Sequence, residues 1–284
     1  MEFRPIQSDA ASLAHYCALM VACFPGSNKF TPTYMTWLYA DNPDGKAVGF
    51  DTWEGDRLAA HYVCIPARAR VEGREVTLLL SLNTATHPSF QGKGLFTKLA
   101  QQTYQAAAEQ GFEGIYGVAN ANSTPGFIRK LGFQLVRPLE ARVGMGRLHG
   151  DGASAVPVAF ERSWSSASLA WRCANPDNPV RYRQQGDSLQ FAANALAGTL
   201  IPAYAQLPAA GLALARPADA FGLAPMRLFL GLAPDAAANY WNYVSIPQRL
   251  RPSPLNLIYR SFNPAVTSLD PAAIRFGFLD FDAY

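Results

Sequence analysis

The segment from Leu78 to Gly111 constrains the fold of this chain more than any other feature of the sequence. It begins with an apolar run and passes through the turn Gln91–Gly94. Apolar residues then recur at the three- and four-residue spacings of a helix that Gly111 can end. The pattern predicts a strand, a glycine-rich turn and a helix start in succession. Such a turn favours anions, because free backbone N–H groups and the helix dipole point at it and glycine lets a phosphate come close.

The turn differs from the common nucleotide fingerprints, because the chain has no GxxxxGK[ST] and lacks the glycine spacing of a dinucleotide-binding loop. Residues 91–96, Gln-Gly-Lys-Gly-Leu-Phe, instead resemble motif A of the GNAT acyltransferases, [QR]-x-x-G-x-[GA], with Phe96 at the place of the small residue. Residues 84–88 precede the turn as the central strand of that family does. Residues 127–133 resemble its later helix and Gly-Phe signature. The chain is therefore identified as a member of the GNAT superfamily.

The resemblance implies an α+β (mixed α/β) chain, because the GNAT fold has a central mixed, mostly antiparallel sheet flanked by helices. Hairpin turns at residues 54–56 and 72–74 agree with three antiparallel strands that lead into the glycine-rich turn. Strands are expected at residues 3–5, 47–53, 57–71, 75–86, 114–118 and 133–143, and helices near residues 9–24, 34–38, 95–110 and 125–131.

At 284 residues the chain is long enough for two domains. The composition shifts to Gly, Ala, Ser and Asp around Gly146–Val156, which predicts a linker there. We expect a GNAT acyl-CoA-binding domain at residues 1–147. A C-terminal α/β domain at residues 148–284 would bind the acceptor or form a homodimer, and one interpretation makes it a degenerate GNAT-like repeat. Its strands are expected at residues 189–195, 199–204, 226–232, 255–262 and 274–281, and its helices near residues 165–172 and 235–244.

Composition excludes several classes of protein. The net charge of +3 comes without any long basic run, which argues against a nucleic-acid partner. The four cysteines have no metal-ligand spacing, so we expect reduced thiols and no metal. The N-terminus lacks the apolar core of a signal peptide, and no apolar run approaches the length of a membrane span. A soluble cytoplasmic protein without a membrane partner is expected.

The resemblance implies that acetyl-CoA or another acyl-CoA is the cosubstrate and that an amine accepts the acyl group. The central strand would pair with the pantetheine arm, and the turn would hold the pyrophosphate. The cofactor-binding residues assigned in this way are Thr84, Ala85, Thr86, Gln91, Gly92, Lys93, Gly94, Leu95, Phe96, Asn122 and Phe127. We expect the bulky side chain of Phe96 to turn toward the core. The family commonly has a tyrosine near the leaving thiolate, and Ile128 stands there in this chain. A thiol with a pKa near roughly 8.5 can leave without that acid.

His61 is the candidate general base, because imidazole titrates near working pH, with a structural histidine as the alternative. Asn83 is the second catalytic candidate, since a polar side chain can hold the amine or the tetrahedral oxyanion. His87 is expected to be a turn residue. Asp51 and Glu54 are expected to be surface charges at the hairpin.

The acceptor is suggested by resemblance alone. Trp37, Tyr39 and Asn42 would line its site, although the two aromatic side chains could instead pack on the sheet. The passage from Asp41 to Phe133 is similar to two-part GNAT proteins of bacterial surface-polysaccharide assembly, which implies a nucleotide-linked amino sugar as acceptor. Another small-molecule or protein amine, or a catalytically silent CoA-binding module, are the alternatives. Aromatic side chains that could stack on the nucleotide base or form core are Trp164, Trp171, Tyr240, Trp241, Tyr243 and Tyr259.

Overall fold

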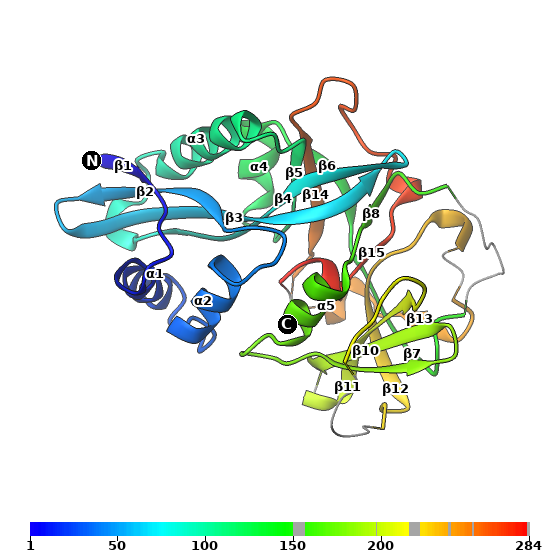
Figure 1. The fold of residues 1–284 in the computed structure, drawn as a ribbon. Helices are drawn as coiled ribbons and strands as arrows, with labels where there is room; N and C mark the ends of the chain where they lie inside the picture. The colour runs from blue at the N-terminus through cyan, green and yellow to red at the C-terminus, as the bar shows by residue number, and fades with distance from the viewer. Residues whose placement is uncertain (150–156, 197, 216–221, 238–239, 252, 283–284) are drawn as a thin grey trace. The chain divides into compact units, whose positions relative to one another are not determined.

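The computed structural model describes residues 1–149, 157–196, 198–215, 222–237, 240–251 and 253–282. Most of the predicted linker, residues 150–156, lies outside the described residues. The chain divides into two compact units (Figure 1). The first comprises Met1–Arg68, Val76–Leu135 and Ile258–Ser268, and the second comprises Ala69–Glu75, Val136–Leu257 and Leu269–Tyr284.

The first unit is built on a mixed sheet. Its strands are β1 (Glu2–Pro5), β2 (Val48–Glu54), β3 (Arg57–Val71), β4 (Arg74–Thr86), β5 (Gly114–Ala119), β14 (Asn256–Ser261) and β6 (Gln134–Pro138), in the spatial order β1-β2-β3-β4-β5-β14-β6. The short strand β8 (Phe160–Arg162) pairs with the end of β3 at Ala69–Val71. β1 with β2 and β2 with β3 are antiparallel, whereas β4 and β5 are parallel. The expected mixed sheet with three antiparallel strands before the glycine-rich turn is therefore confirmed.

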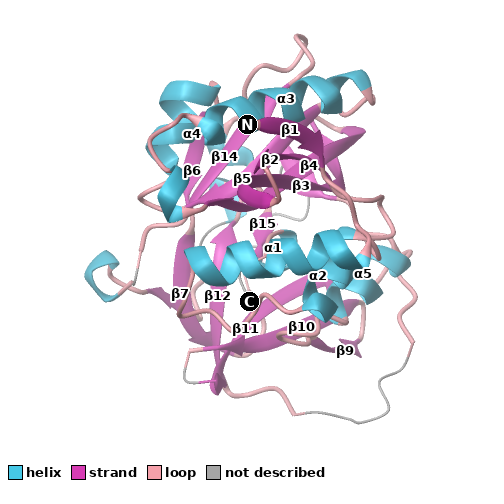
Figure 2. Ribbon diagram, turned by 90° about the vertical axis from the view of Figure 1, so that its left-hand side faces the viewer, coloured by secondary structure: helices cyan, strands magenta, loops and turns pink. Residues whose placement is uncertain are grey.

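Helices cover both faces of this sheet, with α1 (Ala10–Cys23) and α2 (Pro32–Tyr39) on one face and α3 (Leu95–Glu109) and α4 (Thr124–Leu131) on the other (Figures 1 and 2). Asp9 caps α1 by accepting from the N–H groups of Ala11 and Ser12, and Thr31 caps α2 by accepting from Tyr34 N. α3 is amphipathic, and its buried side chains pack on a core of β3, β4, β5 and α4 residues. Burial of these side chains, which form one apolar stripe along α3, fixes where the helix begins relative to the end of β4.

The second unit has a sheet of its own, with the order β13-β7-β12-β11-β10-β9 and β15 paired to β12. Its strands are β7 (Glu140–Met145), β9 (Arg181–Gln185), β10 (Ser188–Ala195), β11 (Gly198–Pro208), β12 (Met226–Leu232), β13 (Tyr243–Ser245) and β15 (Phe276–Gly277). Helix α5 (Ser166–Cys173) packs with Phe191 and Phe278 in a separate core. Residues 235–244 were expected to be helical, and their described part, 235–237 and 240–244, has a 3-10 turn (Asp235–Ala237) and the start of β13.

The division of the chain differs from the predicted boundary after residue 147 at two points. β7 hydrogen-bonds to β12 and β13, so the segment after Val136 belongs to the second unit. The predicted strand at residues 255–262, assigned to the second domain, is β14, which lies between β5 and β6 of the first sheet. The segment Val136–Leu257 is thus inserted in sequence between two strands of one sheet. A pattern of local periodicity cannot reveal which sheet a late strand joins.

Among the described residues, no helix is long and apolar enough to cross a membrane. A cytoplasmic location stays a prediction.

The second unit buries a carboxylate at Asp280. One of its oxygens accepts from Gly277 N at 2.6 Å and the other from the indole Nε1 of Trp164 at 3.2 Å. Burial outweighs the nearby charge of Arg162 and raises the pKa of Asp280 to about 6. Removal of water from the carboxylate disfavours its charged form, so the folded protein holds this proton at a pH where the unfolded chain has lost it.

This raised pKa predicts a dependence of stability on pH. The unfolded aspartate titrates near 3.9. The contribution of protonated Asp280 to the free energy of unfolding is therefore full below about pH 4 and is lost as the pH rises to about 6. The loss is on the order of 3 kcal/mol. Asp280→Asn should have a lower urea midpoint than the wild type at pH 4, and the gap should shrink by pH 7. A gap that stays constant over this range would contradict the raised pKa.

Candidate active site

β4 continues past its pairing with β5. The recorded pairing of β4 with β5 runs from Leu79↔Ile115 to Ser81↔Gly117, after which β4 extends to Thr86 whereas β5 ends at Ala119. Asn83, two residues past the last pair, has a φ of 43°. A side chain other than glycine is uncommon in this left-handed region, so it marks a local kink in the strand. The predicted pantetheine segment, Thr84–Thr86, lies in this continuation.

The glycine-rich turn that follows β4 leaves the start of α3 open. Gly92 and Gly94 have φ values of 78° and 71°, and no atom lies within 4 Å of the place where either would carry a Cβ. Gly94 is the N-cap of α3, and among the described residues no side chain caps this helix, whereas Asp9 and Thr31 cap α1 and α2. The N–H groups that begin at Leu95 are therefore available to a ligand. This arrangement fits the phosphate groups of coenzyme A.

Positive charge lies beside the turn. Phe90, in the short 3-10 segment Pro88–Phe90, is buried, with Lys93 Nζ 5.0 Å and the Arg57 guanidinium 5.3 Å from its ring centroid. His87 caps this segment by accepting from Ser89 N at 3.2 Å, as expected for a turn residue. The two cations favour an anion over the turn.

Phe96 is directed into the core, as expected for its departure from the family motif. Its ring lies edge-on to Tyr62 and Phe127, with centroids 5.9 and 5.3 Å apart. A Cβ at Gly126 would approach Phe96 Cε1 to 3.3 Å, so the absence of a side chain on α4 makes room for the bulky ring. Phe127 is itself buried in the same core, and Ile128 packs against it.

Two further predicted CoA residues lie at the surface. Gln91 is exposed, and its amide donates to Thr86 O at 3.5 Å. Asn122 is exposed in the turn after β5, where its N–H is held by the side chain of Asn120 at 3.0 Å. Both side chains are free to approach a ligand on this side of the sheet.

The two predicted catalytic residues are joined by a buried chain of hydrogen bonds. His61 is fully buried, with Nδ1 2.6 Å from Asp51 Oδ1 and Nε2 2.9 Å from the hydroxyl of Tyr39. Asn83 Nδ2 in turn donates to the Tyr39 hydroxyl at 3.3 Å. Burial raises the pKa of Tyr39 well above its usual value, so its hydroxyl stays protonated. His61 does not reach the surface itself and connects to it through Tyr39 and Asn83.

Sequence reasoning was wrong about Asp51, which is buried at 2% exposure, whereas Glu54 is exposed as expected. A simple count back from the hairpin turn sets Asp51 opposite Ala60. The register shifts by one between Thr52 and Trp53, because Ala59 of β3 is an extra residue between their partners Ala60 and Leu58, so that Asp51 lies opposite His61. The alternation of burial along β2 was the available signal, but the bulge in β3 changes which residue lies opposite.

The three predicted acceptor residues are all buried. Trp37 packs near Tyr34, Tyr39 belongs to the buried chain, and Asn42 holds a turn by donating to Pro66 O at 2.9 Å and accepting from Asp44 N at 3.0 Å. Tyr39 also accepts a hydrogen bond from Asn83 Nδ2.

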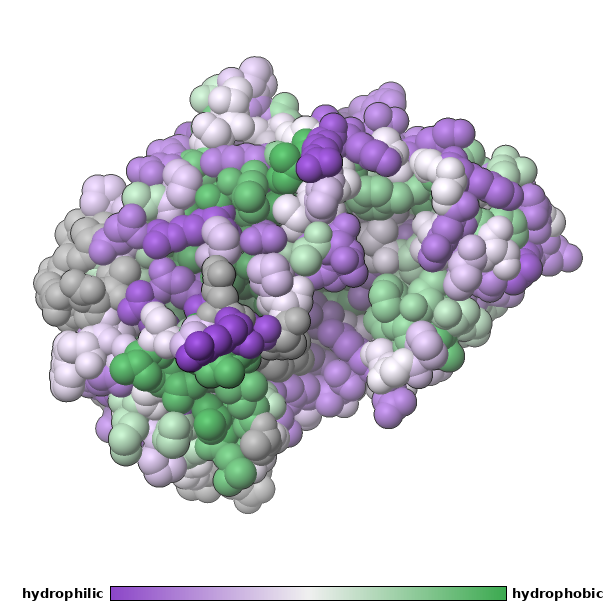
Figure 3. All heavy atoms as spheres, turned by 180° about the vertical axis from the view of Figure 1, so that it is seen from behind, coloured by the Kyte–Doolittle hydropathy of each residue, from purple (hydrophilic) through white to green (hydrophobic). Residues whose placement is uncertain are grey.

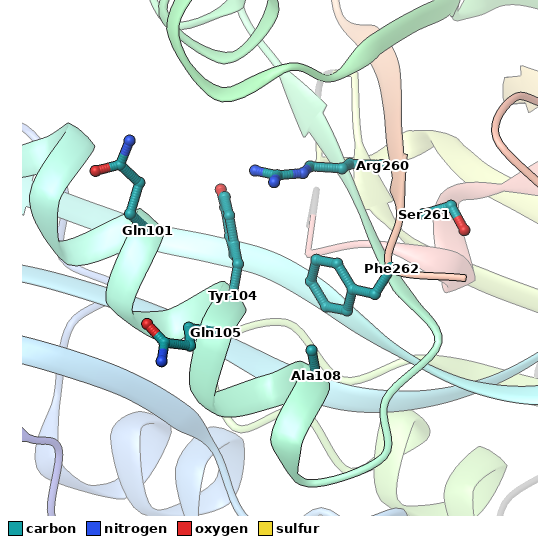
Figure 4. Close-up of a pocket in the computed structure, with 7 residues that line it drawn as sticks. All are labelled: Gln101, Tyr104, Gln105, Ala108, Arg260, Ser261 and Phe262. Atoms are coloured by element: carbon teal, nitrogen blue, oxygen red, sulfur yellow. The ribbon is translucent and has the colours of Figure 1, made fainter. Parts of the chain in front are cut away.

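A cavity of about 380 Å³ lies elsewhere in the first unit, between the second half of α3 and the end of β14 (Figure 4). It is lined by Gln101, Tyr104, Gln105, Ala108, Arg260, Ser261 and Phe262. The Arg260 guanidinium lies 5.0 Å from the Tyr104 ring centroid and donates to Leu131 O at 2.8 Å. None of the lining residues belongs to the glycine-rich turn or to the end of β4, so the cavity is separate from the candidate site.

The cysteines are free thiols, as expected. Burial raises the pKa of both Cys64 and Cys173 to about 12. Across the described part of the chain, no group of three or more His, Cys, Asp or Glu side chains could hold a metal ion.

Residues 2–136 match the family model of the acetyltransferase (GNAT) domain. Among solved structures, the chain is similar to a GCN5-related N-acetyltransferase from Anabaena variabilis, at 11% identity and a TM-score of 0.58 over 92% of this chain and 73% of that one. It is similar to a probable N-acyltransferase from Enterococcus faecalis at 12% identity and a TM-score of 0.53, again over 92% and 73%. A third match is Eis1 from Mycobacterium abscessus, at 11% identity and a TM-score of 0.56 over 90% and 73%.

No curated protein matches the sequence. The predicted GNAT fold with a second C-terminal part is confirmed, and the family match of residues 2–136 supports the predicted class of N-acyltransferase enzyme.

Substitution at the turn tests the phosphate assignment. Gly94→Trp should weaken binding of coenzyme A at least tenfold in calorimetry, because a side chain would enter the open space over the α3 N-terminus. Gly111→Trp is the matched control. Gly111 has a φ of 86° and equally open space at its Cβ position, and it lies at the opposite end of the same helix. Equal effects of the two substitutions, or full affinity in Gly94→Trp, would contradict the assignment.

Proposed function

We propose that the protein is an N-acyltransferase that transfers an acetyl or other short acyl group from acyl-CoA to an amine. The observation that carries this proposal is that two features follow one another along the chain. β4, which runs past its pairing with β5, is followed by the glycine-rich turn and by the uncapped N-terminus of α3, with cations beside it. The GNAT match of residues 2–136 supports the same chemistry.

The reaction assigns distinct tasks to this chain. Acyl-CoA supplies the activated carbonyl carbon and the thiolate leaving group. The amine nitrogen bonds to that carbon, the carbon–sulfur bond breaks, and the proton that the amine gives up is taken by solvent or by the departing thiolate. The N–H groups from Gly92 to Phe96 would bind the pyrophosphate, and the backbone of Thr84–Thr86 would pair with the pantetheine arm. Gln91 and Asn122 would add contacts from the surface. The buried Phe127 would act only by supporting Phe96.

We further propose a nucleotide-linked amino sugar as the acceptor, in surface-polysaccharide (lipopolysaccharide) biosynthesis. The similarity of the passage from Asp41 to Phe133 to two-part GNAT proteins of that process supports it. Of the aromatic side chains suggested to stack on a base, Trp241 is 75% exposed and available for stacking, whereas Tyr243 and Tyr259 are buried. Another small-molecule or protein amine is the second candidate.

The second unit is proposed as an acceptor-binding or homodimer-forming part. It carries most of the exposed large hydrophobic side chains, and Figure 3 shows apolar atoms gathered on one side of it. These side chains are Met145, Leu196, Leu200, Met226, Trp241, Val244 and Leu250. Surfaces of this kind are typical of sites that bind partners.

The test of function is release of thiol from acetyl-CoA against a panel of dTDP- and UDP-linked 3-amino and 4-amino sugars. The matched controls are the same nucleotide sugars with a hydroxyl in place of the amine. Release with one amino sugar but not with its hydroxyl analogue, with an acetylated product found by mass, is the expected result. No release with any amine, while coenzyme A still binds, would favour the silent binding module.

A further inference from the structure

The buried chain of hydrogen bonds has a defined direction. The hydroxyl of Tyr16 accepts from Gln7 N at 3.0 Å and lies 2.8 Å from Asp51 Oδ2. Since a backbone N–H can only donate, the single proton of Tyr16 is directed to Asp51. Asp51 therefore accepts on Oδ2 from Tyr16 and on Oδ1 from His61 Nδ1. Both oxygens of this buried carboxylate are satisfied from inside the protein.

The direction continues from the carboxylate to β4. In the His61 tautomer that carries its proton on Nδ1 alone, Nε2 is an acceptor and takes the proton of the Tyr39 hydroxyl. The oxygen of Tyr39 is then left to accept, and it accepts from Asn83 Nδ2. This bond orients the amide of Asn83. If the amide were flipped, the acceptor Oδ1 would face the lone pairs of the Tyr39 oxygen.

The other half of that amide is unengaged. Within the described part of the chain, no hydrogen bond uses Asn83 Oδ1, and the atom is not among the buried polar atoms that lack a partner. Asn83 is half-buried and lies in the kinked part of β4 just past its pairing with β5. A half-buried polar acceptor held at a strained backbone position is typical of a residue kept for function.

We propose that the chain Tyr16–Asp51–His61–Tyr39 is a positioning device that fixes Asn83 Oδ1 as the acceptor for an N–H group of the incoming amine. This inference rests on the proposed transferase function. A hydrogen bond from the amine N–H to Oδ1 turns the nitrogen lone pair away from Asn83 and toward the acyl carbon. His61 then acts through Tyr39 and Asn83 and does not contact the substrate.

Loss of the Tyr39 hydroxyl should release the amide. In Tyr39→Phe the ring is kept, but Asn83 can rotate and present Nδ2, a donor, to the amine. We expect kcat/KM for the amino sugar selected by the panel to fall about tenfold, with the dissociation constant of coenzyme A changed by less than twofold. Asn83→Ala should likewise lower kcat/KM for the amine and leave the dissociation constant of coenzyme A nearly unchanged. Tyr104→Phe, which removes another buried tyrosine hydroxyl that bonds to Tyr62, is the matched control and should change neither quantity.

The proposal is overturned if Tyr39→Phe leaves kcat/KM for the amine unchanged, or if it weakens coenzyme A as strongly as the amine. A second measurement is independent of turnover. In ¹⁵N-labelled protein, the Asn83 Nδ2 proton that is donated to the Tyr39 hydroxyl should exchange slowly in the wild type and quickly in Tyr39→Phe, and unaltered exchange would also overturn the proposal. If the wild type acylates no amine, the proposed function fails, while the exchange experiment still decides whether the chain holds the amide.

Discussion

The unsatisfied N-terminus of α3 is the feature on which the candidate site depends. Four N–H groups at the start of any helix need partners, and this helix begins at a glycine with a left-handed φ and without a side-chain cap. Side chains at Leu95, Leu99 and Thr103 are buried in the sheet and fix the helix axis. The open end is thus held rigidly beside the end of β4. A ligand that carries phosphate satisfies both the hydrogen bonds and the dipole.

The sheet that supports this helix is completed late in the chain. β14 lies between β5 and β6, although residues 139–255 separate it from β6 in sequence. The first sheet therefore forms only after residues beyond Leu255 are available, and contacts of such long sequence separation are costly to close during folding. The first unit consequently depends on chain segments from both sides of the insertion.

Much of the first unit could be predicted because its signals are local. The turn at Gln91–Gly94, the amphipathic stripe of α3 and the inward side chain of Phe96 follow from glycine chemistry and helical period. The pairing of Asp51 with His61 could not be predicted, since one bulge residue decides it. The place of β14 depends on pairing between distant strands, which local periodicity does not encode.

The most direct test of the central claim is a crystal structure with acetyl-CoA bound. The account predicts pyrophosphate oxygens within hydrogen-bond distance of the N–H groups of Gly92–Phe96, pantetheine amides paired with Thr84–Thr86, and the acyl carbon next to Asn83. A pyrophosphate bound away from the glycine-rich turn, for example beside Arg260 in the cavity under α3, would contradict it.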